Sequence, residues 1–205
     1  VIVPQGIFLT GTLVMKSNVE LYLEKGATLL GSIDAKDYPE DLGIYGLIIA
    51  DGQENITISG SGTIDGQGQE LALAIDSLHH SGQKVDPNYN YRRQRPGKRP
   101  RLVLFNDCNN VQVLGIQAKD AASWVLHFEG CNQLVIDRVR VESDAYWNND
   151  GMDIEDCKNV RITHCYVNSA DDGICLKSSD PDSFCDQVYI ANNLIRSSAS
   201  AIKFG

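Results

Sequence analysis

The stretch N-N-D-G-M-D-I-E-D-C-K-N-V-R-I-T-H-C-Y-V-N-S-A-D-D-G-I-C-L-K-S, residues 148–178, decides the fold. An acidic cluster stands at each end of it, and 22 residues separate Asp150 from Asp172. The segment between the clusters reads as strand, turn, strand, because apolar and polar residues alternate. We interpret this spacing as one coil of a helical stack, which would place the two acidic clusters side by side.

The same pattern recurs along the chain. An Asn or Gln followed by alternating apolar residues begins at positions 18, 55, 110, 133, 159 and 187, and the last three spacings are 23, 26 and 28 residues. Short strands at such a period, without hairpin signals, are typical of a parallel β-solenoid whose coils must stack to bury their apolar sides. We therefore predict an all-β fold, a right-handed parallel β-helix with coils of about 22–28 residues.

Stacking implies two further ladders. The Asn/Gln side chains would form hydrogen bonds along the stack. Four cysteines each stand two residues before the Asn/Gln: Cys108, Cys131, Cys157 and Cys185. We expect these thiols to remain reduced and packed, because parallel in-register side chains rarely meet the dihedral angle of a disulfide.

The 205 residues read as one β-helix domain, 1–205, with an insertion at 66–100. Residues 70–80 of the insertion have the composition of a short helix, and a basic run follows at 92–101. Both ends of the chain are strand-like, so we expect the domain to be incomplete at its C-terminus. The basic run is either a solvated loop or a flap that binds carboxylates of an acidic substrate through Arg99 and Arg101.

One column of residues faces a predicted groove. Counting back seven residues from successive repeat cysteines, and aligning the next coil through its apolar residues, brings together Arg101, Trp124, Asp150 and Asp172. Equivalent residues in adjacent coils lie about 4.8 Å apart. A cation, an aromatic ring and two carboxylates in a row suit an acidic sugar chain. The alternative is a chance column on a solvated sheet face.

Three carboxylates, Asp150, Asp171 and Asp172, are candidates for acid–base chemistry. Hydrolysis of a glycosidic bond needs one protonated carboxyl group and one ionised carboxylate, and crowding of like charges supplies the former. Asp171 and Asp172 are neighbours, so both reach the groove only if the chain bends, which Gly173 favours. The alternative is an acidic turn without chemistry, or one that binds calcium.

The composition excludes some partners. The formal net charge of −9 argues against non-specific nucleic-acid binding. No apolar run approaches the roughly 18 residues of a membrane span. We therefore expect neither a nucleic-acid nor a membrane partner, and no signal peptide is recognisable.

The chain resembles glycoside hydrolase family 28, the polygalacturonases and their relatives, over essentially its whole length. The resemblance lies in V-P-Q-G-I-F-L-T-G-T-L, L-Y-L-E-K-G-A-T-L-L-G-S, G-S-G-T-I-D-G-Q-G, R-P-R-L-V-L-F, S-W-V-L-H-F, N-N-D-G-M-D-I and D-D-G-I-C-L-K-S. It implies a right-handed parallel β-helix that hydrolyses pectic chains, polygalacturonan or rhamnogalacturonan, with inversion. It also implies that no cofactor or metal is needed, that the protein acts outside the cell or in the periplasm, and that it is a monomer.

The last two motifs resemble the catalytic motifs of that family. By this resemblance Asp171 is the general acid, and Asp150 and Asp172 activate the attacking water. Asn148 would hold its neighbours by hydrogen bonds. Asp153 and Lys177 would support the site from the substrate-binding side.

The chain departs from the family pattern one coil later. The polygalacturonases carry Gly-His-Gly there, whereas this chain has Ser198 or Ala199 where the histidine would fall. A substrate other than plain polygalacturonan, such as rhamnogalacturonan, therefore fits as well. Two other classes of function stay open: a β-helical polysaccharide lyase or epimerase, and a non-catalytic solenoid that binds glycans.

Overall fold

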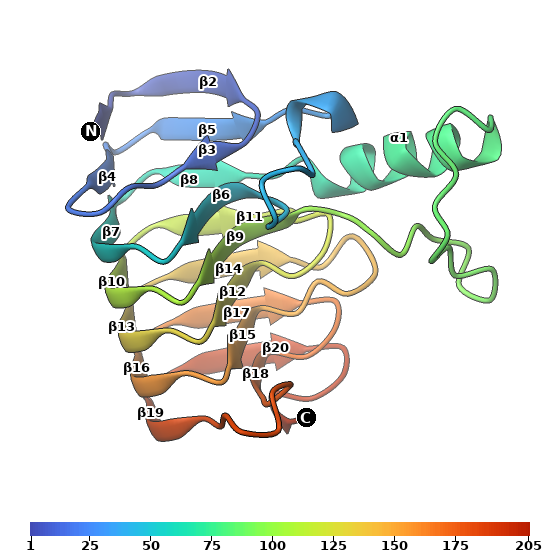
Figure 1. Ribbon diagram of the computed structural model, residues 1–205. Helices are drawn as coiled ribbons and strands as arrows, with labels where there is room; N and C mark the ends of the chain where they lie inside the picture. The colour runs from blue at the N-terminus through green and yellow to red at the C-terminus, as the bar shows by residue number, and fades with distance from the viewer.

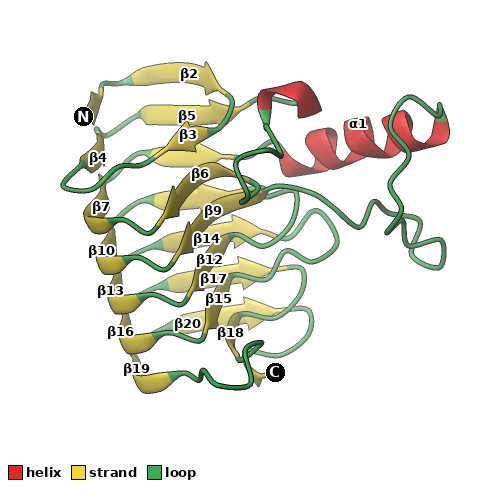
Figure 2. Cartoon of the chain, viewed as in Figure 1, coloured by secondary structure: helices red, strands yellow, loops and turns green.

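Each coil of the chain contributes one short strand to each of three parallel sheets. The computed structural model describes residues 1–205, and each sheet contains seven strands. The coils stack one below the other (Figure 1), and strands dominate the stack while the long helix lies outside it (Figure 2). The prediction of an all-β, right-handed parallel β-helix is confirmed.

The strands of each sheet follow the order of the coils. The first sheet consists of β1 (Ile2–Val3), β4 (Glu20–Leu23), β7 (Glu54–Gly60), β10 (Asn109–Leu114), β13 (Asn132–Asp137), β16 (Lys158–Thr163) and β19 (Asp186–Ala191). The second consists of β2 (Gly6–Thr10), β5 (Ala27–Gly31), β8 (Thr63–Asp65), β11 (Gln117–Lys119), β14 (Arg140–Ser143), β17 (Tyr166–Ser169) and β20 (Leu194–Ser197). The third consists of β3 (Leu13–Val14), β6 (Gly46–Asp51), β9 (Arg101–Asn106), β12 (Leu126–Glu129), β15 (Met152–Glu155), β18 (Ile174–Lys177) and β21 (Ile202–Phe204).

The register of the third sheet decides which residues become neighbours. Val103, Leu126, Met152 and Ile174 are paired in succession along β9, β12, β15 and β18. The residues two positions before them are Arg101, Trp124, Asp150 and Asp172. The predicted column is therefore confirmed as a feature of the backbone.

The core lies between the sheets and is built from repeated columns. Phe105 and Phe128 are fully buried and meet edge to face, with ring centroids 5.8 Å apart. The six cysteines are free, as expected for the repeat column, and the thiols of that column donate to backbone carbonyl groups, as Cys157 does to Phe128 at 3.3 Å. Burial of each apolar column stabilises the stack by about 25 cal/mol per Å² removed from water.

The Asn/Gln residues of the repeat share an unusual backbone conformation. All six have positive φ, between 53° and 64°: Asn18, Asn55, Asn110, Gln133, Asn159 and Gln187. Left-handed backbone is costly for most residues, and Asn tolerates it best after Gly. The repeat is therefore first of all a turn signal.

The amides form the expected ladder only in part. Asn55 donates to Asn18 at 2.9 Å, and Asn110 donates to Asn55 at 2.8 Å. The ladder then moves by one position, because Asn132 donates to Asn109 and Asn159 donates to Asn132. Gln133 keeps the left-handed turn, but the shorter side chain of the preceding asparagine supplies the amide.

The insertion 66–100 begins with helix α1 (Gly68–His80), which confirms the expected helix and starts it two residues earlier. Leu71 and Ile75 share its buried face. The first residue must be glycine, because a Cβ on Gly68 would lie 2.0 Å from the carbonyl carbon of Ala121. A 3₁₀ helix, η1 (Ala35–Asp37), packs near α1. No helix of the structure combines the length and the apolar character needed to cross a membrane.

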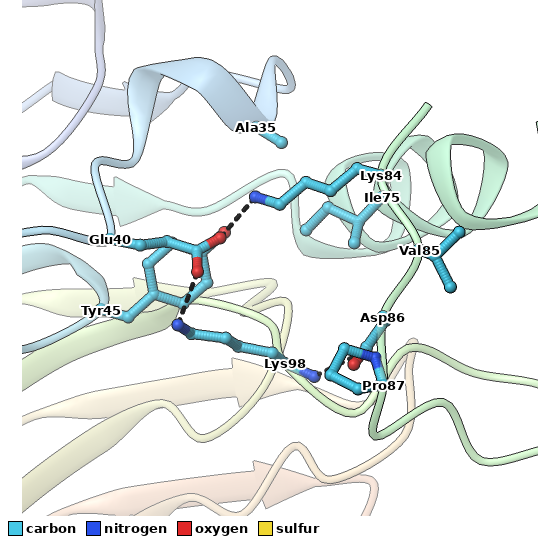
Figure 3. A pocket seen from close by; sticks show the side chains of 9 residues that line it. All are labelled: Ala35, Glu40, Tyr45, Ile75, Lys84, Val85, Asp86, Pro87 and Lys98. Carbon is cyan, nitrogen blue, oxygen red and sulfur yellow. Dashed lines mark hydrogen bonds and ion pairs between the residues drawn. The ribbon is translucent and has the colours of Figure 1, made fainter. Parts of the chain in front are cut away.

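Ion pairs attach the rest of the insertion to the stack. Lys84 and Lys98 both donate to the carboxylate of Glu40, and the Lys98 distance is 2.6 Å (Figure 3). Asp86 accepts hydrogen bonds from the backbone of Gly97 and Lys98 at 2.7 and 3.1 Å. These contacts fix the segment 90–100, which we call the flap, to the side of the coil that contains Tyr45.

The turn role of the repeat is testable at Asn110, whose φ is 54°. Asn110→Ala and Asn110→Gly both remove the amide from the ladder, but only alanine is strained by left-handed backbone. We expect the alanine variant to be less stable than the glycine variant by about 1–2 kcal/mol. Urea unfolding of the two variants measures the difference, and equal midpoints would contradict the backbone explanation.

Candidate active site

Acidic side chains gather where β15 and β18 begin. Asp150 and Asp172 lie two residues before these strands, and Asp153 lies within β15. All three are buried, with exposures of 4%, 6% and 0%. A carboxylate oxygen of Asp150, one of Asp172 and the thiol of Cys175 lie within 4.8 Å of one another. The predicted neighbours therefore meet through their side chains as well as their backbones.

Two glycines allow the coils to approach this closely. A Cβ on Gly151 would lie 2.6 Å from the carbonyl oxygen of Gly173, and one on Gly173 would lie 2.6 Å from that of Ala201. The G of each D-G motif is thus required by backbone packing between coils. Gly173 was expected to favour a bend, and the chain does bend there and at Asp171.

Asp171 differs from its neighbours because its carboxyl group forms no hydrogen bond within the protein. Its backbone carbonyl accepts from the hydroxyl groups of Ser169 at 3.1 Å and Ser197 at 2.8 Å. The side chain is partly exposed. The hydroxyl groups thus fix the backbone of Asp171 while its carboxyl group stays available to a ligand.

Lys177 lies between the buried carboxylates and an aromatic ring. Its ammonium nitrogen is 2.6 Å from Asp153 Oδ1 and 3.5 Å from Asp150 Oδ2. It also lies 3.7 Å from the ring centroid of Trp124. Burial alone would lower the pKa of Lys177, but the two carboxylates outweigh burial and raise it. Lys177 is therefore a permanent cation of the site.

The protonation of the buried carboxyl groups is uneven. Burial raises the pKa of Asp150 to about 6, with Lys177 opposing and the charges of Asp171 and Asp172 adding to the rise. Burial and the charge of Asp150 raise the pKa of Asp153 to about 7 despite Lys177. A proton is therefore held within the cluster close to neutral pH.

Asp172 behaves in the opposite way. Its Oδ1 accepts a hydrogen bond from the backbone of Ser200 at 3.0 Å, and the ammonium nitrogen of Lys203 lies 3.3 Å from its Oδ2. Burial alone would raise the pKa of Asp172, but these two partners outweigh burial and lower it. Lys203 was not among the predicted site residues, although its position one coil after Cys175 follows from the same register.

Arg101 and Trp124 form one wall beside the carboxylates. The guanidinium carbon of Arg101 lies 4.6 Å from the ring centroid of Trp124. Lys177 contacts the same ring, so two cations share one indole. Both Arg101 and Trp124 are partly exposed. These predicted groove residues are therefore brought together with the acids.

Arg99 lies elsewhere than expected. Its side chain is 1% exposed, so it does not present its charge at the surface. The guanidinium donates to the backbone oxygens of Ala122 and Trp147 and to Oδ1 of Asn148, each at 2.8 Å. The substrate contact that the basic run suggested for Arg99 is thus corrected to a structural contact, which joins the flap to the segment carrying the first acidic motif.

Asn149 is a second anchor, which sequence reasoning missed. Its fully buried amide donates to the carbonyl oxygens of Ala121 and Ser123 at 2.7 and 2.9 Å. Its Oδ1 accepts from the backbone of Tyr146 at 3.1 Å. Asn148 has left-handed backbone, φ 56°, so the two adjacent asparagines serve different partners. Only the doubled asparagine in the motif signalled this contact.

The exposed part of the flap presents arginines and an aromatic ring. The guanidinium carbon of Arg93 lies 5.6 Å from the ring centroid of Trp147, which is 49% exposed. Burial and the charge of Arg93 lower the pKa of Arg95, while the charges of Tyr146 and Asp171 oppose this change. The basic run is therefore divided between anchoring residues and residues that face solvent beside the site.

Two groups of side chains have the spacing of metal ligands. One is Asp150, Asp172 and Cys175, but lysine ammonium groups already contact both of these carboxylates. The other is formed by His127, Glu129 and Glu155, where His127 Nε2 lies 3.0 Å from Glu155 Oε2. Both groups have their own hydrogen-bond or ion-pair partners, and we assign a metal to neither.

Comparison with known sequences identifies the family. A sequence model described as "Glycosyl hydrolases family 28" matches residues 1–195. The chain belongs to this family. A probable polygalacturonase of Vitis vinifera is 28% identical over 192 residues, covering 86% of this chain and 36% of its own length. An endo-polygalacturonase of Pectobacterium carotovorum is 25% identical over 199 residues, covering 91% and 48%.

Solved structures agree with this assignment. An exopolygalacturonase from Thermotoga maritima has a TM-score of 0.78 and 26% identity, and the match covers all of this chain and 54% of that one. This family 28 chain spans less than half the length of the curated relatives described above.

The pH dependence of stability tests the burial of Asp153. The pKa of the Asp153 carboxyl group is about 7 in the native protein, against an ordinary value of 3.8 in the unfolded chain. Between these two pH values the native state therefore binds more protons than the unfolded state. The free energy of unfolding should therefore fall as pH rises through this window. Asp153→Asn cannot titrate, and its stability relative to the wild type should rise with pH. Urea unfolding across the window measures this, and parallel pH profiles would contradict it.

The anchoring role of Arg99 predicts that lysine cannot replace it. Arg99→Lys keeps the charge, but its single ammonium nitrogen replaces two guanidinium nitrogens that together reach three acceptors. We expect the loss of this geometry to cost about 1–3 kcal/mol. Arg92→Lys, in the exposed part of the same run, should change stability by no more than about 0.5 kcal/mol. Chemical unfolding compares the two variants, and equal effects would argue against the anchor.

Proposed function

We propose that this family 28 protein hydrolyses glycosidic bonds of polygalacturonan, a pectin-type uronic-acid polysaccharide. The observation that carries the proposal is the column of Arg101, Trp124, Asp150 and Asp172 with Asp171 beside it. Carboxyl groups that differ in environment can divide the roles of acid and base. The names of the family relatives support the same reaction.

The acidic residues share the two proton transfers of the reaction. Asp171, whose carboxyl group has no partner within the protein, gives its proton to the glycosidic oxygen as the bond to the anomeric carbon breaks. Asp172, aided by Asp150, takes a proton from a water molecule, whose oxygen forms the new bond to that carbon. Attack from the opposite face inverts the anomeric centre. Solvent then returns a proton to Asp171 and removes one from the base.

The remaining groove residues suit an acidic sugar. Arg101 can bind a uronate carboxylate, and the ring of Trp124 offers an apolar surface to a sugar face. Lys177 adds positive charge and fixes Asp153. Asn148, held by Arg99, borders the same acids. We include Arg101, Trp124, Lys177 and Asn148 among the substrate-binding residues. We treat the buried Asp153 and Arg99 as their support.

Rhamnogalacturonan is the second candidate substrate, because Ser198 or Ala199 stands where the polygalacturonases carry histidine. A lyase mechanism is less well supported. It needs a free base beside the uronate carboxylate, whereas Lys177 and Lys203 are each paired with aspartates. We further propose that the protein acts as a monomer, outside the cell or in the periplasm.

The proposal predicts a large effect at Asp171. Asp171→Asn keeps the shape of the side chain but removes its acid function, so turnover should fall about 100- to 10,000-fold. The measurement is the release of reducing ends from polygalacturonan, with rhamnogalacturonan assayed in parallel.

Asp186→Asn is the matched control, because Asp186 is an exposed aspartate of β19 in the first sheet and should leave turnover unchanged. Unchanged activity of Asp171→Asn would remove the assigned acid. An unsaturated product absorbing in the ultraviolet would replace hydrolysis by elimination.

A further inference from the structure

Lys203 is a cation of the site, and its ammonium group is in ion-pair contact with Asp172. It lies in β21, and the register pairs it with Cys175 of the preceding coil. Within its coil column, Asp153 and Cys175 come before it. The column thus runs from a buried carboxylate through a thiol to an ammonium group.

Every protein contact of the Asp172 carboxylate is with a donor. Ser200 donates its backbone N–H to Oδ1 at 3.0 Å. Lys203 donates to Oδ2 at 3.3 Å, and the thiol of Cys175 lies 3.6 Å from the same oxygen. Lys203 is the only cation in ion-pair contact with Asp172. The orientation of this carboxylate is therefore set from the coil that follows it.

The other carboxyl groups around Asp172 act against its ionisation. The Asp150 carboxylate lies within 4.8 Å, and Asp171 is the preceding residue in the chain. Lys177 is committed to Asp153 and Asp150. Two carboxylates at this distance do not both ionise freely unless a cation compensates. Without Lys203, Asp172 would face Asp150 without its own counter-charge.

We propose that Lys203 is a positioning residue of the hydrolysis, which holds Asp172 ionised and aimed beside Asp150 so that Asp172 is the base that accepts the proton of the attacking water. The proposal rests on the proposed function. The opposite pKa shifts of the two aspartates, upward for Asp150 and downward for Asp172, agree with this division. Lys203 itself contacts no reacting atom in this role.

The test compares Lys203→Met, which removes the charge, with Lys203→Arg, which keeps it. The pH dependence of kcat on polygalacturonan reports the base in the enzyme–substrate complex. In Lys203→Met the acidic limb should move to higher pH by about 1 unit or more, with a loss of about tenfold in kcat on that limb and little change in KM. Lys203→Arg should restore the limb. Lys25→Met, at an exposed turn of an early coil, should behave as the wild type.

A readout without substrate separates this inference from the proposed function. In protein labelled with ¹³C at the aspartate carboxyl carbons, the signal of Asp172 should titrate at higher pH in Lys203→Met than in the wild type. If the wild type hydrolyses neither polymer, the proposed function fails. The role of Lys203 as a positioning residue for hydrolysis then fails as well, even if the ¹³C titration of Asp172 shifts in Lys203→Met. An unmoved acidic limb and an unmoved titration in an active enzyme would overturn the role of Lys203 itself. A raised KM with an unmoved limb would also overturn it, in favour of direct substrate binding.

Discussion

In-register hydrogen bonding between parallel strands is the constraint on which the site depends. It converts a sequence separation of one coil into lateral contact, so that pairing Met152 with Ile174 necessarily brings Asp150 beside Asp172. Two carboxylates so close repel each other, and in a flexible chain they would separate. Here they cannot, because the strands that follow them are buried in the core through residues such as Ile154 and Ile174. The free energy gained by packing the coils therefore maintains an electrostatic arrangement that is unfavourable by itself, and crowded acids are what the proposed chemistry requires.

Positive charge relieves this crowding unequally. Lys177 of β18 contacts Asp153 and Asp150 of the preceding coil. Lys203 of β21 contacts Asp172, which also belongs to the preceding coil. Each lysine thus reaches back to an earlier coil, as expected for long side chains stacked above a column of short ones. The two neighbouring carboxyl groups therefore differ in their affinity for a proton, because the pKa is raised at Asp150 and lowered at Asp172. A symmetrical pair would share its proton, whereas this pair has a defined base.

Periodicity explains which parts of this arrangement could be predicted from the sequence. The fold and the column of Arg101, Trp124, Asp150 and Asp172 follow from counting residues between repeats, because a solenoid depends almost entirely on nearest-neighbour stacking. Contacts outside the repeat do not follow from it. Arg99 belongs to a basic run of which some members face solvent, and nothing local marks it as the buried one. Asn149 carries the same side chain as Asn148, and the two differ in their backbone, which is left-handed at Asn148.

The two adjacent aspartates show how small a local difference separates two roles. Asp172 stays in the column, two residues before β18, and accepts hydrogen bonds from two donors of the following coil. Asp171 lies at the bend before it, where serine hydroxyl groups bind its backbone carbonyl and leave its carboxyl group free. Strict alternation would have directed these side chains to opposite faces of the sheet. The bend removes that alternation, and the close contact of Gly173 with Ala201 keeps the bend in register with the next coil. A fixed, ionised carboxylate and an unpartnered one therefore arise from consecutive residues, which is the pairing that general-base and general-acid catalysis needs.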